Sequence, residues 1–173
     1  MFDLQIFSEP VHGRKMVYLY RLHEEAANTA GTNLAFVTEN TRTKSKDSES
    51  TATKDGAITT PGTVEHEIES TSLLAKGDEM IEKLEDALDN DKLLDIWEAN
   101  LDEPAAEGQN KFKGRYMQGY ITEMEVSSTA EEHVEISLTF AVNGAGAKGD
   151  VTVSAEQQEM ANYVFTDTAA AGA

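Results

Sequence analysis

The chain has 173 residues and a mass of 18.9 kDa, which suggests one domain with a core of its own. It contains no cysteine, and this excludes disulfides, thiolate metal sites and a cysteine nucleophile. Lys and Arg number 14 against 32 Asp and Glu, so the formal charge is −18 and the surface repels nucleic acid rather than gripping it.

The first residues lack the basic start and long apolar stretch of a signal peptide, and no apolar run reaches the roughly 20 residues of a membrane span. We therefore expect a soluble protein that is not secreted. We expect an N-terminal arm over residues 1–13, a single domain over 14–155 and a C-terminal arm over 156–173.

Residues 15–22 are rich in β-branched, aromatic and aliphatic side chains, which predicts a strand. A polar stretch over 24–33 predicts a turn. The strand that follows over 34–39 is expected to pair with 15–22 as a hairpin.

Residues 40–56 have a different character, because Ser and Thr fill seven of the 14 positions between Asn40 and Thr53. The segment has four basic residues against three acidic ones and no large apolar side chain before Gly56. We expect a long functional loop, mobile in the monomer. The basic residues are Arg42, Lys44, Lys46 and Lys54.

Residues 58–75 again predict a strand. Val64, His66, Ile68 and Ser70 fall on one face by the two-residue period, and Glu65, Glu67 and Glu69 fall on the other. Three like charges in line repel one another unless water screens them, so the glutamate face is expected to be wet.

Residues 77–90 predict an amphipathic helix, with Asp78 as its N-cap and one apolar stripe. The stripe consists of Met80, Ile81, Leu84, Ala87 and Leu88. Residues 92–101 fit either a helix or a strand by pattern, and we favour a strand. Residues 76–103 hold 3 lysines and 11 acids, so this segment carries 3 − 11 = −8 of the net charge.

Two long alternating segments, 112–126 and 132–142, predict an antiparallel hairpin, with a kink at Gly114 or Gly119. Glu123 and Glu125 alternate with apolar residues on the first of these strands. A short last strand around Val151 and Val153 and a helix or ordered arm over 157–165 complete the pattern. The fold class is therefore mainly β, an antiparallel sandwich or barrel-like fold with one flanking helix and the 40–56 loop.

No motif in the chain carries catalysis or cofactor binding. The run from Gly144 to Gly149 matches G-x-G-x-x-G, but a strand follows it where a dinucleotide site needs a helix. The four histidines are isolated, and the segment from Asp89 lacks the glycine of a calcium loop. We expect no enzyme activity, cofactor or metal, although 32 acids always offer candidate carboxylate pairs for a hydrolase.

The order of these elements resembles the major tail protein, or tail tube protein, of long-tailed phages of Gram-positive hosts. The most specific pieces are Ala35-Phe36-Val37-Thr38-Glu39 and Thr53-Lys54-Asp55-Gly56, which are followed by the acidic helix and the C-terminal hairpin. The resemblance spans about residues 14 to 155.

The resemblance implies a virion protein, assembled in the host cytoplasm, that forms six-fold rings stacked into a tube. It also implies partners: further copies of the chain, a tape-measure protein, a tail terminator and distal tail proteins, with no membrane. DNA would pass along the lumen without specific binding. The expected lumen residues are Glu65, Glu67, Glu69, Glu123 and Glu125, and the expected inter-ring residues are Arg42, Lys44, Lys46, Lys54 and Asp55.

A second class of function stays open at this point, a monomeric β-sandwich binding module such as an adhesin domain. Its weakness is the missing secretion signal. Rings or tubes in electron micrographs of the purified protein would separate the two.

Overall fold

The computed structural model describes residues 9–162 of the chain. In chain order its elements are η2 (Gly13–Lys15), β1 (Met16–Leu22), η3 (His23–Glu25), β2 (Val37–Thr53), β3 (Gly56–Leu73), α1 (Glu79–Asp89), β4 (Leu94–Pro104), β5 (Lys111–Ser127), β6 (Glu135–Val142), β7 (Ala147–Thr152) and α2 (Ala155–Asn162). No helix in this part of the chain is both long and apolar enough to cross a membrane.

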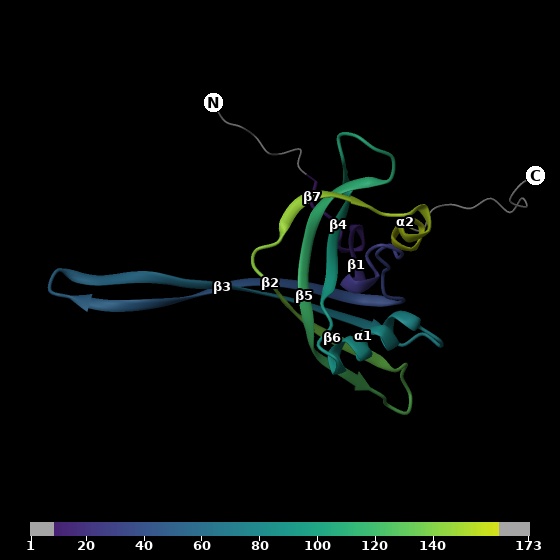
Figure 1. Cartoon of the computed structure of the whole chain (residues 1–173), viewed down its shortest axis with the longest axis horizontal. Coiled ribbons are helices and arrows are strands. Elements are labelled where there is room, and N and C mark those ends of the chain that lie inside the picture. The colour runs from purple at the N-terminus through teal and green to yellow at the C-terminus, as the bar shows by residue number, and fades with distance from the viewer. Residues whose placement is uncertain (1–8, 163–173) are drawn as a thin grey trace, which may run out of the picture.

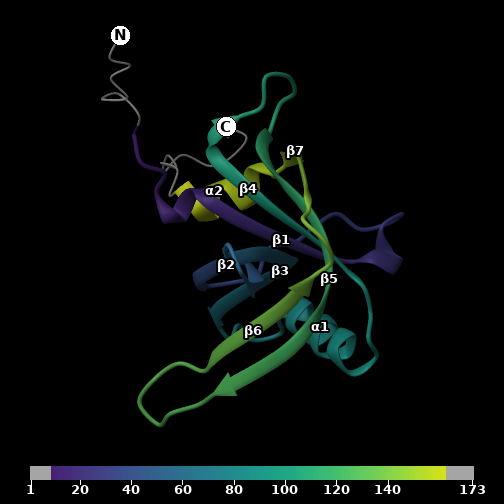
Figure 2. The ribbon, with the colours of Figure 1, turned by 90° about the vertical axis from the view of Figure 1, so that its left-hand side faces the viewer.

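All seven strands belong to one antiparallel sheet with the order β1-β4-β5-β6-β3-β2, and β7 pairs with β5. β5 pairs with β4 up to Gly119, with β7 from Lys111 to Tyr116, and with β6 from Gly119 onward. The sheet folds over at this point into two leaves (Figure 2). The first leaf contains β1, β4, β7 and the start of β5, and the second contains the rest of β5 with β6, β3 and β2.

The main core lies between the two leaves. Tyr20 of the first leaf stacks on Phe140 of the second, with ring centroids 5.0 Å apart. Ile96 on β4 and Ile68 on β3 are fully buried in the same cluster. A smaller cluster around Leu19, on the outer side of the first leaf, includes Ala99, Leu101, Val151 and Val153. The first leaf is therefore buried on both sides.

The predicted amphipathic helix and its cap are confirmed. The Asp78 carboxylate accepts a hydrogen bond from the backbone N–H of Met80 at 3.0 Å. Ile81, Leu84 and Ala87 are buried in the main core, while the acidic residues between them face solvent. The helix therefore covers one end of the space between the leaves.

A buried carboxylate ties three strands of the first leaf together. Asp95 on β4 binds the guanidinium of Arg21 on β1 at 2.7 Å and accepts a hydrogen bond from the Tyr116 hydroxyl on β5, also at 2.7 Å. Burial alone would raise the pKa of Asp95, but hydrogen bonds from Arg21, Tyr116, His23 and Gln118 outweigh it and hold that pKa below its ordinary value. Asp95 is thus a charged anchor inside the leaf.

The mainly β, antiparallel fold with one flanking helix is confirmed, but two details of the prediction are wrong. The strand over 15–22 pairs with β4, not with residues 34–39. β1 buries apolar side chains on both faces, and β4 offers apolar side chains on both faces, whereas the 34–39 segment ends in exposed polar residues.

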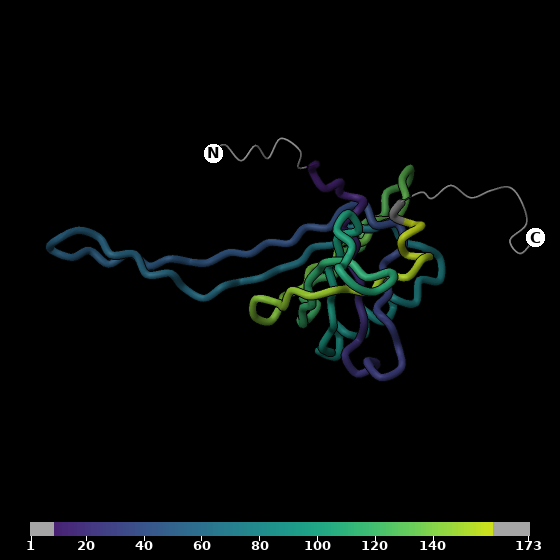
Figure 3. Tube along the Cα trace, turned by 90° about the horizontal axis from the view of Figure 1, so that it is seen from above, coloured from purple at the N-terminus to yellow at the C-terminus, as the bar shows by residue number. Residues whose placement is uncertain are grey.

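The second correction concerns residues 40–56, which are not a loop. β2 and β3 pair from Val37–Ser72 to Thr53–Gly56, with register shifts after Val37 and after Lys46, and form a long hairpin that projects from the body (Figures 1 and 3). Strand pairing uses backbone hydrogen bonds, which need no apolar side chains, and the many threonines favour extended backbone. We call residues 44–66, the part of the hairpin that extends beyond the pairing of β3 with β6, the arm.

We expect Leu84→Ala to destabilise the chain by about 2–5 kcal/mol, because it opens a cavity where the side chain is fully buried. Urea unfolding of the monomer measures this. Glu85→Ala, on the solvent side of the same helix, is the control and should change stability by less than about 0.5 kcal/mol. A similarly small effect of Leu84→Ala would show that the helix does not pack as described.

Candidate functional site

The outward side of the second leaf carries exposed polar side chains from all four of its strands. Direct partners across a sheet share one face, and Thr41, Glu69, Thr139 and Glu123 form one such row from β2 to β5. We call this the polar face. Its members are Thr41, Thr43, Ser45, Glu65, Glu67, Glu69, Glu123, Glu125, Ser137 and Thr139. The five glutamates expected from sequence thus lie on one exposed surface.

A β-bulge at Thr122 decides which side chains of β5 reach this face. Ile121 pairs with Phe140 and is buried, but the next paired residue is Glu123, opposite Thr139. The extra residue reverses the alternation, so Ile121 and Glu123 point to opposite sides. Strict alternation, as expected from sequence, would have placed them on the same side.

The arm separates its charges between its two faces. Lys44 pairs with His66 and Lys46 pairs with Val64, so these lysines share the face opposite to Glu65 and Glu67. Burial, together with the nearby lysine and arginine charges, lowers the pKa of His66, so the imidazole is neutral at pH 7. One face of the arm is therefore cationic and the other anionic.

The root of the arm is fixed to the first leaf through Glu98 of β4, which is 6% exposed. The Arg42 Nε donates to its carboxylate at 2.8 Å, and the Tyr18 hydroxyl donates to the same oxygen. Burial, and then the hydrogen bond to Glu98, raise the pKa of Tyr18, so it stays protonated. Lys44 adds a hydrogen bond from Nζ to the Ala145 carbonyl at 3.1 Å.

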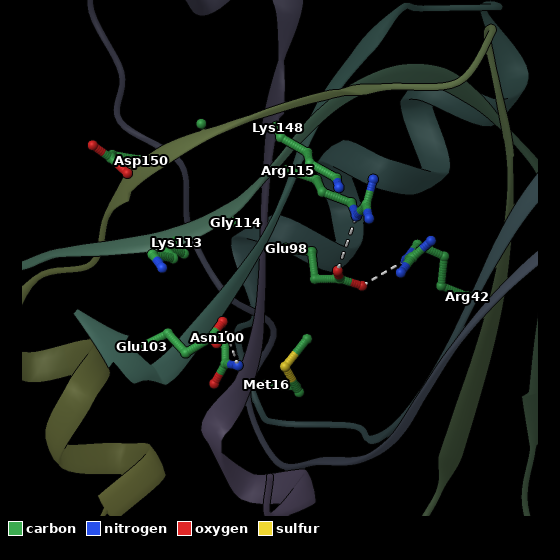
Figure 4. A pocket seen from close by; sticks show the side chains of 11 residues that line it. Met16, Arg42, Glu98, Asn100, Glu103, Lys113, Gly114, Arg115, Lys148 and Asp150 are labelled. Carbon is green, nitrogen blue, oxygen red and sulfur yellow. Dashed lines mark hydrogen bonds and ion pairs between the residues drawn. The ribbon is translucent and has the colours of Figure 1, made fainter. Parts of the chain in front are cut away.

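An open cleft of about 580 Å³ lies beside this anchor (Figure 4). Arg42, Glu98 and Arg115 face one another in it, with 3.8 Å between Arg115 Nε and Glu98. Lys113 and Lys148 also line it, and within residues 9–162 neither lysine forms an ion pair. Four cations thus gather beside the arm root of a strongly acidic protein.

The remaining expected residues lie at the far end of the arm. Lys54 and Asp55 form the two-residue turn between β2 and β3, and Gly56 follows with a φ of +128°. The sequence analysis missed Glu98. In the sequence it is one of several acidic residues of this segment, and its partner Arg42 lies 56 positions away.

The phage tail tube protein family model matches residues 10–148. The chain is 30% identical over 146 residues to a putative tail protein of Staphylococcus phage phiMR25, covering 82% of this chain and 76% of that protein. It is 26% identical over 148 residues to the tail tube protein gp17.1* of Bacillus phage SPP1, covering 86% of this chain and 55% of that protein.

Solved structures show the same fold. The SPP1 tail tube structure matches with a TM-score of 0.73 at 22% identity, over 92% of this chain and 88% of that chain. A chain in the virion of a native gene transfer agent matches with a TM-score of 0.60 at 10% identity, over 81% of this chain and 99% of that one. A chain in the sheath–tube complex of an extracellular contractile injection system matches with a TM-score of 0.55 at 12% identity, over 88% and 99%.

We expect Glu98→Ala to destabilise the monomer by about 3 kcal/mol, because it leaves Arg42 and the Tyr18 hydroxyl without their buried acceptor. Urea unfolding followed by circular dichroism measures the change. Glu103→Ala, at the exposed rim of the same cleft, serves as the control and should be nearly neutral. If both variants unfold at the parental urea concentration, Glu98 does not anchor the arm.

Proposed function

The chain belongs to the phage tail tube protein family, and we propose that its copies form six-membered rings that stack into the tube. It is a structural subunit of the phage tail and therefore of the virion, and it is not an enzyme. The proposal adds the ring number, the stacking and the passage of genome DNA through the lumen during ejection.

The observation that carries the ring proposal is a pair of free edges on one leaf. No strand of the described chain pairs with the outer side of β2, or with β5 from Tyr120 to Ser127 on the side opposite β6. The four strands of this leaf alternate in direction, so the β2 edge of one copy meets the β5 edge of another in antiparallel orientation. A closed ring of leaves would leave no edge unpaired.

The same arrangement would turn the polar face inward to form the lumen wall, because α1 and the first leaf cover its other side. The wall would then present Glu65, Glu67, Glu69, Glu123 and Glu125. A wall of carboxylates repels the phosphate backbone, and DNA can slide because no cations are there to hold it.

The arm would cross to the next ring in the stack. Arg42 and Lys44 have partners within their own chain and would orient the arm, leaving Lys46, Lys54 and Asp55 to contact the neighbouring ring. The counterpart would be the acidic segment 76–103, whose net charge is −8. Opposite charges at such an interface mainly guide encounter and register.

A tail tube of this kind would have further protein partners inside it and at its two ends. A tape-measure protein would occupy the lumen during assembly, a terminator would close one end, and distal tail proteins would form the other. No feature of the described residues requires a membrane or a cofactor for this role.

Electron microscopy of the purified chain at high concentration tests the proposal. We expect rings and tubes whose averaged end views have six-fold symmetry. A protein that stays monomeric at every concentration, by sedimentation as well, would instead favour a monomeric binding module.

Reversing the charge of the lumen wall should impair DNA ejection without preventing assembly. The triple variant Glu65→Lys, Glu67→Lys, Glu69→Lys replaces three repulsive charges by three that bind phosphate. We expect tubes of normal length in virions that adsorb normally but release DNA more slowly, measured by the fluorescence of a DNA-binding dye.

The matched control makes the same charge change elsewhere, with Glu107, Glu156 and Glu159 replaced by lysine, since all three are exposed and lie off the polar face. Equal ejection rates for the two triple variants would contradict the lumen assignment.

The outer arm should gain protection when the tube forms. A two-stranded ribbon without a core is marginally stable in water, so amide hydrogens of Ser48–Ile58 should exchange quickly in the monomer and slowly in the tube. Assembly should also slow as salt rises, because salt screens the guiding charges. Equal exchange in both states, or normal tubes after a short Gly-Ser linker replaces the outer arm, would refute the inter-ring contact.

A further inference from the structure

One aromatic side chain is exposed to solvent and lies on a residue with a strained backbone. Phe36 has a φ of +50°, in the left-handed region that residues other than glycine rarely occupy. Its side chain is 68% exposed, the highest value among the large apolar side chains of residues 9–162. Neither feature benefits an isolated monomer, so both need another explanation.

The local structure fixes this exposure. Leu34, two residues earlier, is buried in the main core, and Val37 begins the edge strand β2. The Phe36 carbonyl accepts a hydrogen bond from the Leu73 N–H at 3.1 Å, which holds the backbone beside β3. The chain turns between the core and the edge at this residue, and the side chain is left exposed to solvent.

The opposite edge of the same leaf has an exposed apolar residue of its own. Val126, near the end of β5, is 58% exposed, and it lies in one row with Ile136, Ser72 and Val37 across the four strands. Phe36 and Val126 therefore mark the same end of the leaf on its two free edges.

We propose that Phe36 is the anchor between neighbouring copies in a ring, with its ring packed against Val126 and the start of the β5–β6 turn of the next copy. This inference rests on the proposed ring. A second copy is the partner that fits, because the two apolar sites lie on opposite free edges that meet when leaves join head to tail.

The stagger of a closed sheet defines the contact more closely. Strands in a barrel tilt, so rows do not meet in line at a junction but shift by a few residues. Val126 lies in the row of Val37, so the residues from Val126 to Thr129 of the next copy are the ones we place opposite Phe36. Apolar contact at this point would also fix the register, since slipping by one residue turns every side chain to the wrong face.

The variant Phe36→Gly separates an anchor from a folding residue. Glycine accepts a positive φ without strain, so the melting temperature of the monomer should stay within about 2 °C of the parent or rise. The protein concentration needed for ring or tube formation should rise at least about tenfold, as expected for loss of a buried aromatic at an interface.

Two further variants serve as controls. Phe36→Leu keeps an apolar side chain and should assemble much closer to the parent than Phe36→Gly does. Val11→Ala removes an apolar side chain that is 47% exposed before η2, away from both edges, and should assemble like the parent. Parental assembly of Phe36→Gly would overturn the inference, and so would a clear fall in its monomer melting temperature.

Cross-linking tests the contact directly, because the chain has no cysteine. Phe36→Cys combined with Val126→Cys, or with Thr129→Cys, should yield disulfide-linked oligomers in assembled rings under mild oxidation. Phe36→Cys combined with Ile58→Cys, at the far end of the arm, should not. Rings without cross-links in the first two pairs would overturn the anchor while leaving the ring proposal intact, whereas failure of the cysteine-free parent to form rings would defeat the ring proposal itself.

Discussion

The whole arrangement depends on how closely β5 approaches its neighbours at two glycines. A Cβ atom on Gly114 would lie 2.1 Å from the Glu98 carbonyl oxygen, and one on Gly119 would lie 2.2 Å from that of Ala141. No other residue fits at either point without moving backbone. Gly119 is where β5 passes from one leaf to the other, so it allows the leaves to face each other across the core. Gly114 brings β5 against β4 at Glu98, where Arg42 attaches the arm. One strand, β5, therefore determines both how the two leaves enclose the core and where the arm attaches.

The strand geometry also determines on which face of the sheet each charged side chain lies. The two-residue period of a strand places the lysines and glutamates of the arm on opposite sides, although they are mixed in the sequence. The bulge at Thr122 then brings Glu123 and Glu125 to the glutamate side while Ile121 stays in the core. Without that extra residue, β5 would direct either carboxylates into the core or apolar side chains onto the polar face. The acidic surface is therefore a property of strand register as much as of composition.

The sequence predicts the individual strands and the helix, but it does not predict which strands pair with each other. The helix over 77–90, the hairpin of β5 and β6 and the exposed side of Glu65, Glu67 and Glu69 follow from periodicity, which is a local signal. The pairing of β1 with β4 does not, because several strands have suitable apolar faces and only the assembled core selects among them. Residues 40–56 resemble a loop in sequence because a solvated ribbon buries almost no apolar side chain. The bulge and the Glu98 anchor depend on contacts between distant residues, which no window of sequence contains.

The acidic polar face and the exposed Phe36 are best understood together. On a monomer, glutamates beside free strand edges oppose chance association, which is how exposed edges are usually protected. In the proposed ring the same carboxylates from every copy would converge on one lumen, and their repulsion would oppose closure. Backbone pairing at each junction adds directional hydrogen bonds, but their net contribution in water is modest. An apolar contact at the junction supplies an attraction that salt and charge do not weaken. In the proposed ring, the exposed Phe36 at one edge and Val126 at the other would therefore offset the repulsion between the carboxylates of the lumen.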